Sequence, residues 1–519
     1  MTKYKTLLFY LTYVVALLPL FIFRDFTPDN ELRYLSIVDE ALSNHTFFAF
    51  TNHAIPYADK PPFYLWCLMA LRSLSGGHFL WLYSIFTLIP ALIIACVFKN
   101  WTYKIIPYES RLVSQGMLLV SGLFLASVIV LRMDMLMCLF IVLAFYEFWK
   151  ITENPDNARP KWLLPLFVFI AIFTKGPYGF LIPFAGTIVY SIWIKKYRYL
   201  AAAWGWRFWM VLIPLCVLWF GMVFLEGGSE YLNNLLFHQT MDRAVNSFHH
   251  AKPFYYYMIS IWYSLIPWSL AILGLIIAGF IKKKHTEGLQ TYFIVISLTT
   301  FVLLSCVSSK IQIYLLPAIP FMVYAAAISI PRYQKDGLVK GGLAIIGVVF
   351  IFVLPALGVF NHLQPSDSFN SVWCWIAAGS MTGAGIMTIF FLYFKKSACQ
   401  VNNGIYSLIY GLLVSVFFAG FALPKFNDNI GYRNLAEKII ETSESTGISE
   451  IKFWKVRRPE NMDVYLHREV DIIDNENFNP EIDCQDLKPY ILVADGKKIA
   501  VPPSKNTQVI GKYIVTIIE

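Results

Sequence analysis

Charged side chains are scarce in this chain of 519 residues, in which Asp, Glu, Lys and Arg together make up 14%. Soluble proteins carry about 25%. Apolar residues make up 57% of the chain and gather in runs close to the roughly 20 residues that a membrane-spanning helix needs. The composition therefore excludes an ordinary soluble protein and predicts a polytopic α-helical membrane protein. The net charge of +9 does not indicate a nucleic-acid partner, because Lys and Arg lie in short loops between apolar runs.

Motifs of several soluble enzyme and binding classes are also missing. The eight cysteines show no metal-ligand or disulfide spacing, which excludes a zinc finger or a disulfide-stapled domain. The chain has no Asp-x-Asp and no Gly-rich phosphate loop. A metal-dependent enzyme that uses a nucleotide sugar normally needs the former. A lipid-linked donor needs neither, because the membrane already presents its phosphate.

The apolar runs predict about thirteen spans, with the N-terminal run retained as the first span because it lacks a small-residue cleavage site. The spans lie near residues 5–23, 80–98, 112–131, 134–150, 162–174, 177–194, 207–226, 254–281, 289–307, 311–330, 338–360, 371–394 and 404–423. The basic loops all fall on one side if the N-terminus is cytoplasmic. They are Lys3/Lys5, 99–111, 150–161, 195–207, 282–285, 332–340 and Lys395/Lys396.

The polar segments divide the chain into two predicted domains. Residues 1–424 form the transmembrane domain, with a first outer loop at 24–79 that carries interfacial helices. In that loop, residues 62–75 are too short to span and are interrupted by Arg72, so we expect an interfacial or re-entrant helix. Residues 425–519, here called the tail, lie outside as a small α/β domain. "YRNLAEKIIETSEST" predicts an amphipathic helix, and "EIKFWKV", "DVYLHREVDII", "PYILVADG" and "KYIVTIIE" predict strands.

Five segments on the outer side carry ionisable groups beside apolar runs, where each such group costs roughly 2.5–3.5 kcal/mol unless it pairs or serves function. They are the first outer loop, Arg132–Asp134, 174–177, 237–254 and 308–317. Because all five lie on the same face, we expect them to meet in one cavity.

The residue types in this cavity suit a phosphate and a sugar. The cations Lys60, Lys175, Arg243 and Lys310 suit a phosphate, and Tyr57 and Tyr314 could hydrogen-bond a phosphate or a sugar. Asp29 suits a general base, or a carboxylate that stabilises positive charge on a sugar ring. Asp59 and His238 offer two ligands for a weak or shared metal site.

Structural explanations stand beside these functional ones. Asp29 and Arg33 could form only an i,i+4 pair, worth a few tenths of a kcal/mol. Arg132 and Asp134 could pair or cap a helix, and Lys175-Gly176-Pro177 could be only a tight turn. The tyrosines could belong to the interfacial aromatic belt.

Seven motifs resemble those of the lipid A aminoarabinose transferases, and more broadly the protein O-mannosyltransferase-like clan of GT-C enzymes. They are "TPDNELRY", "YADKPPFYLW", "RMDM", "TKGP", "HQTMDR", "HHAKPFYYY" and "SSKIQIYLLPAIP", within residues 1–330. The resemblance implies an inverting glycosyltransferase of the GT-C type that takes a sugar from polyprenyl (undecaprenyl) phosphate at the periplasmic face.

The resemblance also implies roles for single residues. Asp29 would be the catalytic carboxylate, with Glu31 and Asp134 as further catalytic acidic residues. The donor phosphate would be bound by Lys60, Arg243, Tyr57 and Tyr314, with Arg33, Lys175 and Lys310 as further members. Asp59 and His238 match a pair that can hold zinc or another divalent metal, although the reaction requires no cofactor. The chain departs from the family where Asn30 separates Asp29 from Glu31, and where Asp59 replaces the more usual Glu.

The expected location is the bacterial inner membrane, with the N-terminus cytoplasmic and the tail periplasmic. The expected partners are a lipid-linked donor that carries a sugar such as 4-amino-4-deoxy-L-arabinose, lipid A or another envelope acceptor that receives it, and membrane lipids. The chain itself is expected to be a monomer. Two alternatives stay open: a protein hydroxyl or another envelope glycan as acceptor, and a lipid-linked sugar flippase or transporter. Transporters tend to place charges near the midplane in repeated halves, whereas these charges lie at one face.

Overall fold

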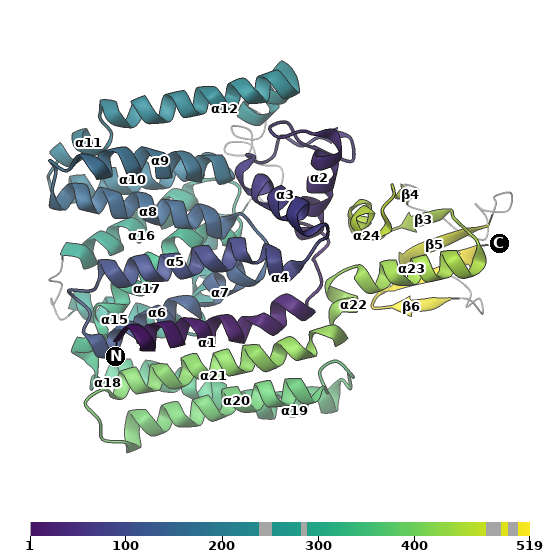
Figure 1. Cartoon of the computed structure of the whole chain (residues 1–519). Coiled ribbons are helices and arrows are strands. Elements are labelled where there is room, and N and C mark those ends of the chain that lie inside the picture. The colour runs from purple at the N-terminus through teal and green to yellow at the C-terminus, as the bar shows by residue number, and fades with distance from the viewer. Residues whose placement is uncertain (1, 238–251, 282–287, 474–488, 497–506, 519) are drawn as a thin grey trace.

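Long helices lie side by side across the molecule, and a small sheet projects from one end of them (Figure 1). The computed structural model describes residues 2–237, 252–281, 288–473, 489–496 and 507–518. Helices form along the apolar runs because a helix satisfies its own backbone N–H and C=O groups in lipid. The longer ones are α1 (Thr2–Phe23), α5 (Ile85–Trp101), α8 (Asp134–Glu153), α9 (Ala158–Lys175), α10 (Tyr178–Trp193), α12 (Trp206–Asn233), α16 (Gly288–Cys306), α18 (Gly337–Ile351), α19 (Val353–Leu363), α20 (Val372–Ile389) and α21 (Gln400–Ala422). Shorter connecting elements are α11 (Arg198–Ala203), η2 (Gln312–Ala318), α17 (Ile319–Ala327), η3 (Ile330–Tyr333) and η4 (Phe390–Phe394).

Eight helices in the described part of the chain are long and apolar enough to cross a membrane, or up to ten if each of two bent pairs is one span. Shorter apolar helices cover Phe63–Ser75, Tyr178–Trp193 and Gln312–Ala327. Each of the predicted spans coincides with a helix or with consecutive helices. The polytopic helical class is thereby confirmed, and the number of thirteen spans stays a prediction.

Two of the predicted spans are broken. α6 (Tyr108–Leu119) and α7 (Gly122–Ile129) meet at 62°, and α14 (Tyr256–Ser264) and α15 (Ser269–Ile281) form the other bent pair. The Gly122 N–H donates to the Ile266 carbonyl at 2.6 Å, so the break in one pair contacts the connection of the other. A Cβ at Gly122 would lie 3.1 Å from the Tyr263 carbonyl oxygen, so this close approach favours glycine.

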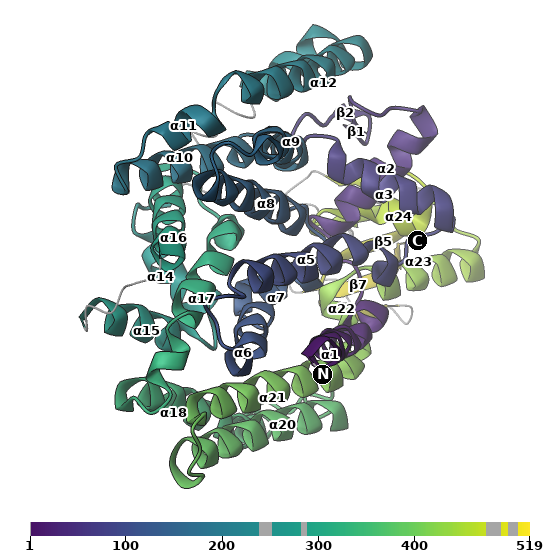
Figure 2. The same ribbon diagram turned by 60° about the vertical axis from the view of Figure 1, so that its left-hand side comes forward.

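The helices form two groups around a shared apolar core. Figure 2 shows α1, α20 and α21 on one side and α8 to α12 on the other, with α5 between them. The first group packs closely, because a Cβ on Gly420 of α21 would lie 2.5 Å from the Pro19 side chain of α1. Side chains of both groups belong to one continuous core.

The first outer loop folds into a compact layer at one end of the helices. It contains α2 (Glu31–Asn44), the two-residue strands β1 (Thr51–Asn52) and β2 (Ile55–Pro56), α3 (Phe63–Ser75) and α4 (Leu80–Tyr83). α3 is the short helix predicted at 62–75. The loop buries Leu35 and Leu68 in a second apolar core.

The tail is a five-stranded sheet with a helix packed on it. The strand order is β4-β3-β5-β7-β6, with β3 parallel to β4 and β5 and the remaining pairs antiparallel. The elements are η5 (Leu423–Lys425), α22 (Asn427–Ile430), α23 (Arg433–Thr446), β3 (Ile451–Trp454), η6 (Pro459–Met462), α24 (Asp463–Leu466), β4 (Asp471–Ile472), β5 (Tyr490–Asp495), β6 (Gln508–Ile510) and β7 (Tyr513–Ile518). Leu435 and Val493 share the second apolar core with the first outer loop, so the tail rests on that loop.

One predicted strand is wrong in part. Most of "DVYLHREVDII" is not a strand: Asp463–Leu466 is the short helix α24, and only Asp471–Ile472 is β4. The helical turn packs against α2, where the Ser36 hydroxyl donates to the Asp463 carboxylate at 2.6 Å. His467 then ends the turn with a left-handed backbone, at a φ of 52°. The other predicted tail elements coincide with α23, β3, β5 and β7.

The N-terminus and the tail lie at opposite ends of the long helices (Figure 1). The connections from α5 to α6 and from α8 to α9, two of the basic loops, lie at the N-terminal end. This arrangement agrees with the charge pattern from which the topology was predicted. The domain boundary at residue 424 stays a prediction.

Candidate active site

A buried carboxylate, Asp134, lies at the start of α8, where the helices meet the first outer loop. Its side chain is 1% exposed and pairs with two cations. The Arg132 Nε donates to one carboxylate oxygen at 3.0 Å, and the Lys175 Nζ donates to the other. Because a buried charge is costly unless it is paired, these three residues form one ion cluster.

The turn after α9 brings Lys175 into this cluster. Lys175 is the last residue of α9, and Gly176 has a φ of 86°, a left-handed conformation that suits glycine. The tight turn expected at Lys175-Gly176-Pro177 is therefore present, and it also presents a cation to Asp134. The Lys175 Nζ lies 4.6 Å from the ring centroid of Tyr314, within the range of a cation–π contact.

Residues of the first outer loop surround the same place. Burial raises the pKa of the Tyr34 hydroxyl to about 12. The charged neighbours of Tyr34 come from both sides: Arg132 and Asp134 from the helices, and Arg33 and Asp59 from the loop. Predicted site residues that are far apart in sequence therefore meet around one buried tyrosine.

Tyr57 lies beside Tyr34 in this cluster. Burial raises the pKa of Tyr57, and the adjacent Arg33 acts against that rise. A phenol that stays protonated can donate a hydrogen bond to a phosphate or sugar oxygen. Asp59 and Lys60 follow on the same connection to α3 and are half-buried.

The end of α12 holds the segment that leads to Tyr57. One Glu226 oxygen accepts from the backbone N–H groups of Phe47, Phe48 and Ala49 at 2.8, 2.9 and 2.9 Å. The Tyr231 hydroxyl donates to the Tyr57 carbonyl at 2.8 Å. The position of Tyr57 thus depends on two side chains of α12.

Glu31 is buried within the protein rather than presented to a cavity. Its side chain is 0% exposed, and its two oxygens accept hydrogen bonds from the two terminal nitrogens of Arg24, each at 2.7 Å. It also accepts the Thr27 N–H and the Leu131 N–H, each at 2.7 Å. These bonds join the end of α1, the start of α2 and the segment before α8, so the contacts of Glu31 are structural.

Asp29 contacts the tail. The Arg457 Nε donates to Asp29 Oδ1 at 2.9 Å, and a second guanidinium nitrogen donates to Oδ2. The Asp29 side chain is 33% exposed. The structural alternative, an i,i+4 pair of Asp29 with Arg33, is not among the ion pairs of the described residues, where Asp29 pairs with Arg457.

Of three further predicted residues, one is bound to backbone carbonyls and two lie outside the described residues. Lys310 is 4% exposed, and its Nζ donates to the carbonyls of Val307 and Lys252 at 2.5 and 3.0 Å. His238 and Arg243 lie outside the described residues. In the described part of the chain, no group of three His, Cys, Asp or Glu residues could hold a metal ion.

Sequence reasoning missed Arg24, Tyr34 and Arg457. Arg24 could have been found from the sequence, because a cation at the outer end of the first span is unusual under the positive-inside rule. Tyr34 belonged to a motif but resembled an ordinary belt residue. Arg457 carried no signal, because its contact with Asp29 joins residues 428 positions apart.

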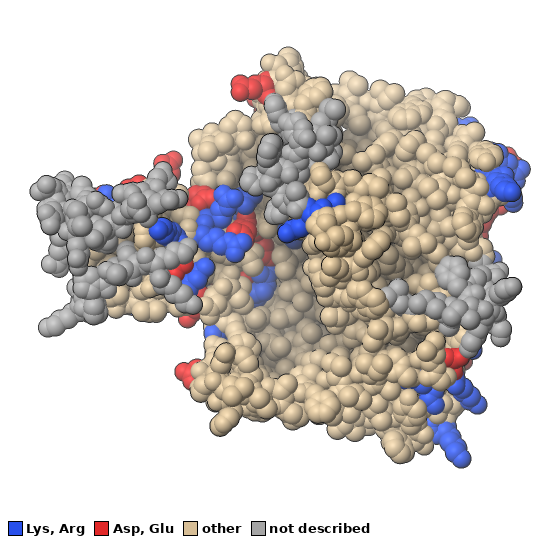
Figure 3. Space-filling view, turned by 180° about the vertical axis from the view of Figure 1, so that it is seen from behind, with Lys and Arg blue, Asp and Glu red and all other residues tan. Residues whose placement is uncertain are grey.

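The charged side chains on the surface lie mainly near the two ends of the helices. Figure 3 shows Lys, Arg, Asp and Glu gathered between the tail and the helices, and again near the opposite end, with broad uncharged surface between. The uncharged surface is what a membrane-embedded region requires.

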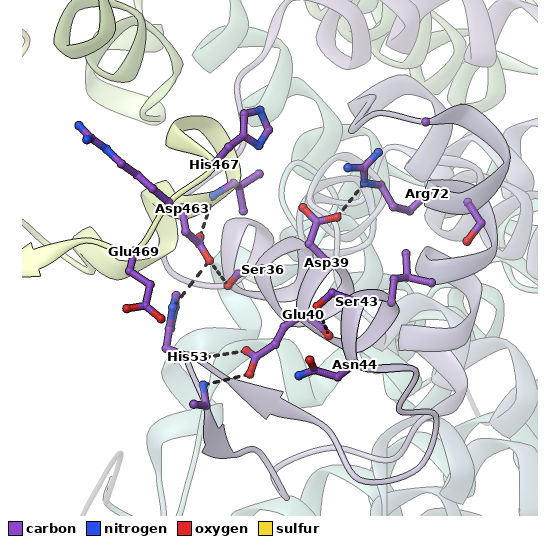
Figure 4. Close-up of a pocket in the computed structure, with 16 residues that line it drawn as sticks. Ser36, Asp39, Glu40, Ser43, Asn44, His53, Arg72, Asp463, His467 and Glu469 are labelled. Atoms are coloured by element: carbon purple, nitrogen blue, oxygen red, sulfur yellow. Dashed lines mark hydrogen bonds and ion pairs between the residues drawn. The ribbon is translucent and has the colours of Figure 1, made fainter. Parts of the chain in front are cut away.

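A cleft of about 820 Å³ separates α2 and α3 from the tail. Figure 4 shows Asp39 turned toward Arg72, and Asp463 turned toward Ser36 and His53. Asp39 binds Arg72 and His78, each at 2.7 Å, and Asp463 accepts from Ser36. Burial raises the pKa of Asp463. These carboxylates hold the tail and loop segments in place.

Relatives with a stated activity share low identity with the chain. No family model matches it. An undecaprenyl phosphate-alpha-4-amino-4-deoxy-L-arabinose arabinosyl transferase of Enterobacter sp. (strain 638) is 23% identical over 375 residues, 67% of this chain and 65% of that protein. A protein of the same description from Pseudomonas fluorescens (strain Pf0-1) is 20% identical over 477 residues, 86% of this chain and 79% of that one. The chain spans less than two thirds of the Enterobacter relative, and 49% of an uncharacterized Aquifex aeolicus relative.

A solved structure has the same fold over the whole chain. It is that of ArnT from Cupriavidus metallidurans bound to undecaprenyl phosphate, with a TM-score of 0.76 at 15% identity, covering 100% of this chain and 98% of that one. The resemblance drawn from the motifs is thereby confirmed. The chain is therefore similar in sequence to these arabinosyl transferases and has the fold of ArnT.

Proposed function

We propose that the chain is an inverting glycosyltransferase that moves a sugar from undecaprenyl phosphate to lipid A at the periplasmic face of the bacterial inner membrane. The cluster around Asp134 carries this proposal, because it gathers cations and tyrosines where apolar helices end. The relatives named as arabinosyl transferases support 4-amino-4-deoxy-L-arabinose, or a related sugar, as the group transferred.

The charge of the cluster suits the donor phosphate. Arg33, Arg132 and Lys175 supply three positive charges, and Asp59 and Asp134 supply two negative ones, leaving a net charge of +1. Lys60 follows Asp59 directly in the chain. We assign donor binding to Lys60, Arg243, Tyr57 and Tyr314, with Arg33 and Lys175 beside them. Cations held near the leaving phosphate would stabilise the charge that develops as the bond to the sugar breaks.

Asp29 would act on the acceptor side. A lipid A phosphate is already ionised near neutral pH and needs little deprotonation, so Asp29 would orient it or stabilise positive charge on the sugar ring. The acceptor oxygen would attack the anomeric carbon from the face opposite the departing phosphate, which inverts the configuration. Glu31 would position the start of α2, since its oxygens already accept bonds within the protein.

A divalent metal is not required by this scheme. Asp59 and His238 could hold one, and a bound ion would add positive charge near the donor phosphate. Two protein ligands are fewer than the three or more of most catalytic zinc sites. The donor phosphate would then rest mainly on the cationic side chains.

Mass spectrometry of lipid A tests this function. We expect a sugar-sized mass that disappears when the gene is deleted, returns with the wild-type gene and fails to return with Asp29→Asn. Unchanged lipid A in the deletion strain would contradict lipid A as acceptor. A sugar lost from glycoproteins or another envelope glycan would then identify the alternative acceptor.

The donor site has a separate test. Lys60→Ala and Arg243→Ala should each raise the apparent KM for the lipid-linked donor about 10-fold or more, the loss expected when a charged hydrogen bond to phosphate is removed. Lys438→Ala, a tail cation paired with Glu441 within α23, serves as the matched control. An unchanged donor KM in both site variants would contradict the phosphate assignment.

A further inference from the structure

The tail reaches the candidate catalytic carboxylate through one arginine. Arg457 binds both oxygens of Asp29 with two nitrogens of its guanidinium group, one of these bonds being 2.9 Å long. Such two-point pairing fixes the orientation of a carboxylate as well as its position. The pair is partly exposed, at 33% for Asp29 and 66% for Arg457.

Both partners are also held through their backbone surroundings. The fully buried Asn461 donates to the Pro28 carbonyl at 2.8 Å, directly before Asp29. The buried Tyr432 hydroxyl donates to the Arg457 carbonyl. The turn after β3 is therefore fixed to the tail at one end and to the segment that carries Asp29 at the other.

Contacts on either side extend this attachment. The Tyr465 hydroxyl and the Arg433 N–H donate to the Asp25 carboxylate at 2.5 and 2.8 Å. Ser36 of α2 donates to Asp463 of α24 (Figure 4). The segment from residue 25 to residue 36 thus contacts the tail before, at and after Asp29.

We propose that Arg457 is a positioning residue for Asp29, so that the tail completes the catalytic site. This proposal rests on the proposed transferase function. Exposed ion pairs add little to stability, so the pair matters for the orientation of Asp29 more than for folding. The tail would then be part of the catalytic unit rather than a separate binding module.

The test compares Arg457→Ala with Arg458→Ala in purified full-length protein. Arg458 lies in the same turn and pairs with Glu460 of the tail at 3.4 Å. We expect Arg457→Ala to lower kcat about 10- to 100-fold, as expected when a reacting group is misplaced. The donor KM and the melting temperature should stay near wild type. Arg458→Ala should change kcat by less than about twofold, and Arg457→Lys should recover part of the loss.

A double variant separates positioning from general damage. In the Asp29→Asn background, adding Arg457→Ala should cause no further loss of residual transfer, because Arg457 would act only through Asp29. A further loss of 10-fold or more in that background would overturn the proposal, as would full activity of Arg457→Ala. Absence of transfer by the wild-type protein would instead contradict the proposed function.

Discussion

Two carboxylates separated by a single residue have different surroundings. Asp29 is partly exposed beside Arg457, whereas Glu31 is 0% exposed and bound by Arg24 and backbone N–H groups. Glu31→Gln should lower the free energy of unfolding by about 3–5 kcal/mol, because it leaves the buried Arg24 without its charged partner. Asp29→Asn should leave that free energy within about 0.5 kcal/mol. Denaturant unfolding of both variants in detergent measures the difference.

The transfer activity of the same two variants distinguishes a catalytic from a structural carboxylate. Asp29→Asn should lower transfer to a small residual rate in protein that is fully folded, and Glu31→Gln should lose activity only in proportion to the folded fraction. A stable Glu31→Gln protein without activity would instead place Glu31 in the chemistry.

The sequence could place these residues in one loop but could not separate their roles. Both lie in the same acidic stretch, and nothing in the spacing tells which side chain faces inward. That choice depends on Arg24 and on the Leu131 N–H, which is 100 residues away from Glu31. By contrast, Asp134, Lys175 and Tyr314 were predictable as neighbours, because each lies where an apolar run ends on the same face.

At the scale of elements, α12 controls the segment that carries Tyr57. Glu226→Gln should speed hydrogen exchange at the amides of Phe47, Phe48 and Ala49, because the charged acceptor of their hydrogen bonds is lost. Glu230→Gln, four residues further along the chain and beyond the kink that Gly228 makes in α12, is the control. Equal exchange in both variants would show that Glu226 does not hold this segment.

The first outer loop carries an acid-sensitive contact between its helices. Burial tends to raise the pKa of Asp39, but hydrogen bonds from His78 and Arg72 and the charges of these two residues outweigh it and hold the pKa below its ordinary value. A carboxylate with a lowered pKa stabilises the folded state above its unfolded pKa, and this contribution is lost as pH falls through the folded value. The melting temperature should therefore be flat near neutral pH and fall below about pH 4. Asp39→Asn should show a lower melting temperature already at pH 7 and a weaker acid dependence.

Elements were more predictable than contacts between them. The apolar runs predicted the helices because spanning length is set by the membrane, and continuous apolar stretches predicted β5 and β7. Part of "DVYLHREVDII" was mispredicted because its contact with α2 favours a helical turn. The breaks at Gly122 and near Ile266 were also missed, since composition continues across both.

At the scale of the whole molecule, the two ends of the helices are expected on opposite sides of the membrane. Cysteines placed at these ends should therefore be labelled from opposite sides. In a background with the native cysteines replaced by serine, Glu444→Cys in the tail should react with a membrane-impermeant maleimide in intact spheroplasts. Asp156→Cys, in the connection between α8 and α9, should react only after permeabilisation. Both positions are exposed. The reverse labelling pattern would invert the proposed topology.

The shared core of the tail and the first outer loop has a consequence for biosynthesis. The Asp25 N–H donates to the side chain of Asn427, which is synthesised 402 residues later. At roughly 5–20 residues per second, that delay is about 20–80 s of translation. During this time the apolar face of α2 stands outside the membrane without the side chains that later cover it. The loop that bears the candidate catalytic carboxylate therefore reaches its final packing only after the tail has been made.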